Sequence, residues 1–180
     1  MISATALFEE LGLAGQIEES VFLAGYDRAL VETPDATILA IADMSQPSTA
    51  KRLYIIDLKA RKLLLRTYVA HGQKSGGLMA ERFSNKKDSH QTSLGLYRVG
   101  TQITSPKHGP ALLLYGLDEG SNDNALAREV IMHGADYVSE DFIKVNGRLG
   151  RSWGCPAVSR ADMPLMIDLL AGGGLLYVHG

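Results

Sequence analysis

The chain has 180 residues, 46% of them hydrophobic and 21% charged, and a formal net charge of −2. A chain of this length and composition can bury one hydrophobic core and is typical of a globular domain. No block of Lys and Arg exceeds two residues, and no apolar run approaches the ~18 residues that a membrane span needs. We therefore expect neither nucleic acid nor a membrane span to be involved in its function.

The first 33 residues are predicted to form two short helices that pack on a main domain of residues 34–180. Hydrophobic side chains recur at helical spacing in residues 5–13 and again in residues 17–31. Pro34 interrupts the second helix, because proline cannot continue the helical hydrogen-bond pattern.

From residue 36 onward, short hydrophobic runs alternate with turn residues, a pattern typical of strands. Strands are expected at residues 37–43, 53–58, 63–69, 94–100, 111–117, 129–133 and 175–179. The second and third of these flank a short polar turn, which indicates a β-hairpin. A weaker strand is expected at residues 142–148, which contain Asn146-Gly147, a strong turn pair.

Two helical segments are expected among these strands. Asn122-Asp123-Asn124 is interpreted as the cap of a helical turn at residues 125–128. Ser159 is expected to cap a helix at residues 160–170, which ends before a run of three glycines. The whole pattern predicts a mixed, mainly β fold: a β-sandwich with short N-terminal helices and one helix near the C-terminus.

The stretch from Gly150 to Ser159 holds the only cysteine and the only tryptophan of the chain. Glycine, serine and proline surround Cys155, which indicates a constrained loop rather than the apolar setting of a structural cysteine. Upstream, His133 ends a short apolar run and is followed by Gly134. Only a thiolate attacks, and a neighbouring imidazole can take the thiol proton. Cys155 and His133 are therefore a candidate nucleophile and base, the alternatives being a structural cysteine and a core histidine.

Four motifs resemble those of the L,D-transpeptidase (YkuD-like) catalytic domain, in the murein L,D-transpeptidase branch with Ser-x-Gly-Cys-Pro-Ala. They are His133-Gly134-Ala135, Gly150 to Ala157, Lys107-His108-Gly109 and Asn122-Asp123-Asn124. The histidine precedes the cysteine, whereas papain-like peptidases have the opposite order. Two positions depart from the better-known Ser/Thr-His-Gly-Cys pattern. Trp153 replaces its second histidine, and Pro156-Ala157 replaces the hydrophobic-Arg pair after the cysteine.

The resemblance implies an L,D-transpeptidase-like β-sandwich in which the expected helix follows the catalytic loop. Cys155 would be the nucleophile and His133 the base, with a backbone carbonyl near Gly134 accepting from its second ring nitrogen. Backbone N–H groups of the cysteine loop, including those of Ser152 and Gly154, would stabilise the oxyanion. Ser152 could equally form hydrogen bonds within the loop.

Five further residues are expected to bind substrate: Arg151, Trp153, His71, His108 and Lys107. A guanidinium such as that of Arg151 can bind a carboxylate through two hydrogen bonds, although it could also be a solvated surface charge, as could Arg148. Trp153 could stack on substrate or form a wall of the pocket. The three histidines at positions 71, 108 and 133 could instead bind a metal, but no zinc motif accompanies them. We expect no metal and no cofactor.

The resemblance implies a cysteine-dependent acyltransferase of the cell wall. Such a peptidoglycan L,D-transpeptidase forms 3–3 cross-links between stem peptides through a thioester, and carbapenem β-lactams inhibit it. The alternatives are an L,D-carboxypeptidase or amidase that hydrolyses the same thioester, and a peptidoglycan-binding module without catalysis. The N-terminal residues lack the basic and long apolar segments of a signal peptide. We expect a periplasmic or cell-envelope protein whose signal peptide is absent from this chain.

Overall fold

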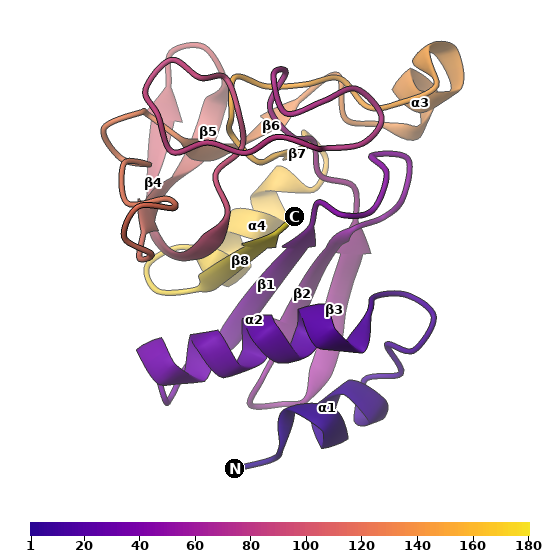
Figure 1. The fold of residues 1–180 in the computed structure, drawn as a ribbon, viewed down its shortest axis with the longest axis vertical. Coiled ribbons are helices and arrows are strands. Elements are labelled where there is room, and N and C mark those ends of the chain that lie inside the picture. Colours follow the sequence, from indigo (N-terminus) through magenta and orange to yellow (C-terminus); the bar gives the residue numbers. More distant parts are fainter.

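The computed structural model describes residues 1–180, which form one mixed sheet of eight strands and four helices (Figure 1). The strands follow the order β3-β2-β1-β8-β4-β5-β6-β7 across the sheet. The pairs β1–β8 and β6–β7 are parallel, and the other neighbours are antiparallel. The strands are β1 (Ile38–Asp43), β2 (Leu53–Asp57), β3 (Lys62–Thr67), β4 (Gly95–Ser105), β5 (Gly109–Gly116), β6 (Ile131–Ala135), β7 (Ala157–Ser159) and β8 (Leu175–His179). The helices are α1 (Ala4–Glu10), α2 (Glu19–Glu32), α3 (Glu140–Asn146) and α4 (Met163–Leu170).

Both halves of the sheet contribute to one hydrophobic core. Successive side chains of a strand point to opposite faces, and in β1 Ala40 and Ala42 belong to this core while Leu39 and Ile41 face the other side. The same core takes buried side chains from β2, β4, β5, β6, β7 and β8, and α4 adds Met163, Met166 and Leu170. The predicted fold class, mainly β with a helix after the cysteine loop, is confirmed.

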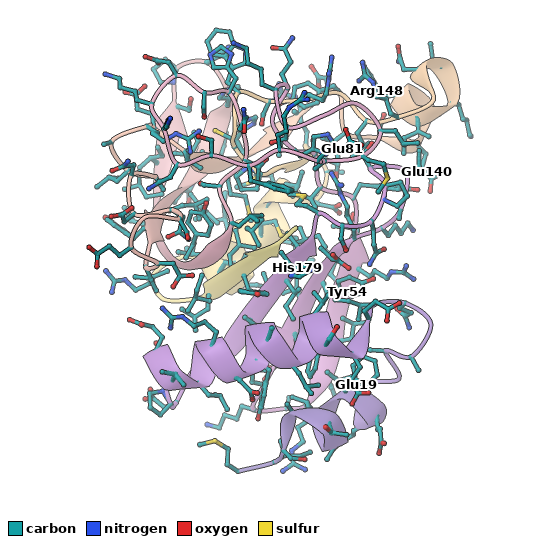
Figure 2. The ribbon with its side chains drawn as sticks, in the orientation of Figure 1. Glu19, Tyr54, Glu81, Glu140, Arg148 and His179 are labelled. Carbon is teal, nitrogen blue, oxygen red and sulfur yellow. The ribbon has the colours of Figure 1, made fainter.

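The N-terminal helices cover the opposite face of the sheet, where α2 packs on β1, β8 and β4 (Figure 1). Phe8 of α1 and Phe22 of α2 are buried there against the outward-facing side chains of β1 and β2. Tyr54 of β2 is fully buried on this side and donates its hydroxyl to the carbonyl oxygen of Gln16 at 2.7 Å (Figure 2). The two predicted N-terminal helices are therefore present. None of the four helices combines the length and the apolar character needed to cross a membrane.

The pairing of β6 with β7 positions the cysteine loop. After β6 the chain forms α3, passes through residues 147–156 and returns as β7, and the register pairs His133 with Ala157. Two isolated bridges attach this return to the segment after β3: Ala70 pairs with Ala157, and Gly72 with Ser152. The loop is thus fixed at both sides.

The predicted strand at residues 142–148 is wrong, because this segment lies largely within helix α3. Ser139 caps the helix by accepting a hydrogen bond from the N–H of Phe142 at 3.0 Å, and two acidic residues occupy the first turn. Gly147 ends the helix in the left-handed conformation, with φ 74°. The Asn-Gly pair therefore belongs to a helix C-terminus and not to a hairpin turn.

Two other predicted helical segments differ in extent. Helix α4 begins at Met163, three residues later than expected, because Ser159 ends β7. The Ser159 hydroxyl oxygen accepts from the N–H of Asp162 at 3.0 Å, in the turn that leads into the helix. Residues 122–128 form consecutive turns, one of which is closed by the N–H of Arg128 donating to the carbonyl of Asn124 at 2.8 Å.

Replacing Phe22 by alanine should lower the free energy of unfolding by about 3–5 kcal/mol, because its fully buried ring lies between α2 and the sheet. Val31→Ala in the same helix is a matched control, since Val31 is 79% exposed and its truncation should cost less than about 0.5 kcal/mol. Urea unfolding followed by circular dichroism measures both. Equally small effects would contradict the packing of α2 on the sheet.

Candidate active site

A cleft of about 710 Å³ lies beside β6, between the β4–β5 turn and the cysteine loop. Most of the predicted site residues line it: Cys155, His133, Ser152, Arg151, Trp153, His108 and Lys107. Gly134 and Gly154 lie directly behind this wall, next in sequence to His133 and Cys155. His71 is the predicted site residue that the structure places elsewhere.

The thiol of Cys155 meets β6 at Ile131. The Ile131 N–H donates to Sγ at 3.4 Å, and the thiol in turn is directed at the carbonyl oxygen of Glu129, 3.8 Å away. Glu129 has a φ of 58°, which is uncommon for a residue with a side chain. His133 follows two residues after Ile131 on the same strand, so the strand places the thiol and the imidazole in one cleft.

The structure determines which nitrogen of His133 carries the proton. Nδ1 lies 2.9 Å from the carbonyl oxygen of Gly134, and because a carbonyl can only accept, Nδ1 is the protonated nitrogen. Nε2 therefore carries the lone pair, and it is buried without a hydrogen-bond partner. Burial lowers the pKa of His133 to about 4, against the opposing effect of the Gly134 hydrogen bond. At neutral pH the imidazole is an uncharged base.

The thiol is also uncharged at neutral pH. Burial raises the pKa of Cys155, while the Ile131 N–H and the positive charges of Arg128 and Lys107 partly oppose this rise. A neutral thiol and a neutral imidazole are the protonation states from which general-base catalysis starts.

Ser152 closes the cysteine loop on itself. Its hydroxyl donates to the carbonyl of Cys155 at 2.6 Å and accepts from the N–H of Gly154 at 3.1 Å. The N–H of Ser152 donates to the carbonyl of His71 at 3.1 Å. The amides of Ser152 and Gly154 are therefore occupied, and those of Trp153 and Cys155 are the loop donors free to stabilise an oxyanion.

Gly154 allows the loop to approach a neighbouring segment closely. Its φ of 118° is disfavoured for residues with side chains, and a Cβ there would lie 2.8 Å from the carbonyl oxygen of Gln91. The same Cβ would lie 3.2 Å from a terminal nitrogen of Arg128.

Arg128 is a cleft residue that the sequence did not indicate. Its guanidinium donates to the carbonyls of Ser84 and Gln91, at 2.9 and 2.8 Å, and to the hydroxyl of Ser89 at 3.0 Å. It thus attaches the 84–91 segment to the back of the cysteine loop and places a positive charge near the thiol. Nothing in the local sequence identifies these distant partners.

The Asn122-Asp123-Asn124 motif fastens the same segment. Asn124 and Asp123 form hydrogen bonds with Asn85, and the buried side chain of Asn122 donates to the carbonyl of Leu96 at 2.9 Å. Its role in turn formation agrees with the interpretation of the sequence.

Trp153 and Lys107 form one edge of the cleft. The indole is 63% exposed, Lys107 Nζ lies 4.3 Å from its ring centre, and the His90 ring stacks on it with centroids 4.7 Å apart. The guanidinium of Arg151 donates to the carbonyls of Gln73 and Gly76, at 3.3 and 3.1 Å, so it is already bonded to backbone.

Two residues weighed as substrate contacts lie outside the cleft. His71 is 1% exposed, and because Arg52 must donate, the 2.8 Å contact between its guanidinium and His71 Nδ1 makes Nδ1 an acceptor. His71 therefore supports the loop from behind and does not face substrate. Arg148 lies beside α3 and donates to the carbonyl of Leu149 (Figure 2).

The comparisons with known proteins concern the fold and the family. The sequence profile described as the L,D-transpeptidase catalytic domain matches residues 16–179. No curated protein matches the chain.

Among solved structures, an L,D-transpeptidase from Mycobacterium smegmatis superposes with a TM-score of 0.50 at 15% identity. The match covers 81% of this chain, which spans 59% of the length of that protein. One from Stackebrandtia nassauensis has a TM-score of 0.48 at 16% identity over 98% of this chain and 76% of its own. An L,D-transpeptidase solved in complex with imipenem has a TM-score of 0.46 at 13% identity, over 79% of this chain and 58% of its own.

The thiol of Cys155 should react slowly with iodoacetamide at pH 7 and faster as the pH rises. Because burial raises its pKa, the thiolate fraction grows only above the pH at which an ordinary cysteine ionises. The alkylation rate measured by mass spectrometry between pH 6 and 10 checks this expectation. A plateau that begins below pH 8 would instead indicate a thiolate already formed in the free protein.

Replacing Arg128 by methionine should slow this alkylation at every pH below the plateau. The substitution removes a positive charge that stabilises the thiolate, so the pKa of Cys155 rises further. Arg98→Met is the matched control, because Arg98 is exposed on β4 and does not line the cleft. Unchanged alkylation in Arg128→Met, with the control also unchanged, would refute the electrostatic role of Arg128.

Proposed function

The chain belongs to the L,D-transpeptidase catalytic domain family, and we propose that it is a cysteine-dependent peptidoglycan L,D-transpeptidase that forms 3–3 cross-links between stem peptides. One observation carries this proposal. The buried Nε2 of His133 has a free lone pair in the same cleft as the only thiol of the chain.

The first half-reaction forms a thioester. Sγ of Cys155 attacks the carbonyl carbon of the third residue of a tetrapeptide stem, a diamino acid, while Nε2 of His133 takes the thiol proton. The carbonyl oxygen becomes negative and accepts from the free amides of Trp153 and Cys155. The peptide bond then breaks, and His133 gives its proton to the amine of the departing D-alanine.

The second half-reaction transfers the acyl group. The side-chain amine of a second stem attacks the thioester carbon, its proton passes to Nε2 of His133, and the protonated imidazole returns a proton to the departing sulfur. The products are a 3–3 cross-link and the regenerated thiol. Loss of one oxyanion donor typically costs about 3–4 kcal/mol of transition-state stabilisation. The positions of the loop amides therefore affect the reaction rate as strongly as the base does.

The rim of the cleft supports binding of an anionic peptide. Lys107 and Arg151 contribute positive charge, and the exposed indole of Trp153 offers an apolar surface between them and the thiol. His108 lines the cleft next to Lys107. Lys107, Arg151 and Trp153 are the proposed substrate contacts.

A carbapenem is proposed to acylate the same thiol, because its strained lactam carbonyl would react as the stem-peptide carbonyl does. Since the proposed substrate belongs to the cell wall, we place the protein in the periplasm or cell envelope.

Intact-protein mass spectrometry after incubation with a carbapenem tests the proposed nucleophile. The mass should rise by one whole carbapenem molecule, because opening the ring expels no group. Cys155→Ala should give no adduct, and His133→Asn should form it at least about 100-fold more slowly. A folded protein with a reduced thiol and no adduct would refute the thioester mechanism.

Product analysis with purified tetrapeptide stems tests the transferase. A cross-linked dimer with release of D-alanine is expected. Tripeptide as the only product would identify a hydrolase instead, because water would then be the sole acceptor of the thioester.

A further inference from the structure

We propose that His108 is a positioning residue, which holds the ring of His133 in the orientation needed for base catalysis. This inference rests on the proposed function of His133 and extends it to a residue of another segment. The contact itself is direct: the two imidazole rings stack with centroids 3.6 Å apart and an angle of 10° between their planes.

His133 needs such support because its ring has a single hydrogen bond. Nδ1 is held by the Gly134 carbonyl at 2.9 Å, whereas Nε2 has no partner. One hydrogen bond fixes one corner of the ring, and the packing around it must hold the rest. The stacked ring of His108 covers one face of His133, which opposes that motion and excludes water from that face.

The backbone of the β4–β5 turn brings His108 to this place. The register of β5 with β6 pairs Ala111 with His133, so the turn just before Ala111 passes close to the histidine. The N–H of His108 donates to the Ser105 hydroxyl at 3.2 Å, and Gly109 follows with a φ of 74°. The turn is therefore closed on both sides of His108.

The charges around His108 favour its neutral form. Burial lowers its pKa, and the positive charges of Lys107 and Arg160 lower it further. Arg160 forms an ion pair with Asp136 at 2.6 Å, and Asp168 of α4 lines a second cavity together with His108. His133 faces it across the stack.

Two stacked imidazoles at this distance cannot both carry a proton at low cost. Their titrations are coupled, and a proton on one ring opposes a proton on the other. Burial is the largest cause of the low pKa of His133, and the charges of His108, Arg160 and Lys107 lower it further. His108 acts on this pKa without contacting the reacting atoms.

Two variants of His108 separate its functions. His108→Phe keeps an aromatic face but cannot titrate, so the carbapenem acylation rate at pH 8 should stay within about threefold of the parent. His108→Ala removes the face, and the rate at pH 8 should fall roughly 10- to 100-fold, as expected for a misplaced catalytic group. His179→Phe is the matched control, because His179 is a half-buried histidine of β8 outside the cleft.

The second measurement does not depend on activity. Proton NMR of the His133 ring between pH 3.5 and 8 gives its pKa in the parent protein and in His108→Phe. The His133 pKa should rise in His108→Phe and stay unchanged in His179→Phe, because only the first variant removes a competing proton. Circular dichroism confirms that each variant is folded.

The outcomes distinguish this inference from the proposed function. An unchanged His133 pKa in His108→Phe, or a full acylation rate in His108→Ala, would overturn the role of His108. Failure of all variants and of the parent protein to form an adduct would refute the thioester mechanism instead. The NMR titration would then decide the effect of His108 on His133 by itself.

Discussion

The candidate site depends on the parallel pairing of β6 with β7. His133 lies within β6, Cys155 lies immediately before β7, and the register that pairs His133 with Ala157 brings Ile131 to the thiol. A shift of one residue would turn His133 to the other face of the sheet and separate base from nucleophile. The hydrogen bonds of Ser152 within the loop, and the bridge that joins it to Gly72, keep this register from slipping.

Burial within this site has opposite effects on its two titratable groups. It lowers the pKa of His133 and raises that of Cys155, so both are uncharged in the free protein. A preformed thiolate–imidazolium pair would require a charge-stabilising environment that the buried end of β6 does not provide. In the proposed mechanism the proton would therefore move as sulfur attacks a bound carbonyl, and the loop amides without a partner would stabilise the charge that develops on the carbonyl oxygen.

The features encoded within a few neighbouring residues were predictable from the sequence. The lone cysteine among glycine and proline, the histidine at the end of an apolar run and nearly all strands belong to this class. Helix α3 was missed because Asn146-Gly147 suits a hairpin turn and a helix C-terminus equally well, and only the cap formed by Ser139 decides between them. The sequence does not identify Arg128 as a site residue, because its partners Ser84 and Gln91 lie 44 and 37 positions earlier in the chain. The expectation that His71 binds substrate is wrong, because its burial against Arg52 is a tertiary contact that no local sequence pattern indicates.

One position of the cysteine loop departs from the pattern of the resemblance. Trp153 occupies the loop position at which the resemblance leads one to expect a second histidine, and its indole contacts Lys107 and His90 at the rim. The imidazole of His108 nevertheless stacks on His133, the proposed base, because the β4–β5 turn brings it there. The sequence motif and the three-dimensional site thus contain the same ring types in different places. The β4–β5 turn therefore carries both the ring that stacks on His133 and the Lys107 side chain that lines the cleft.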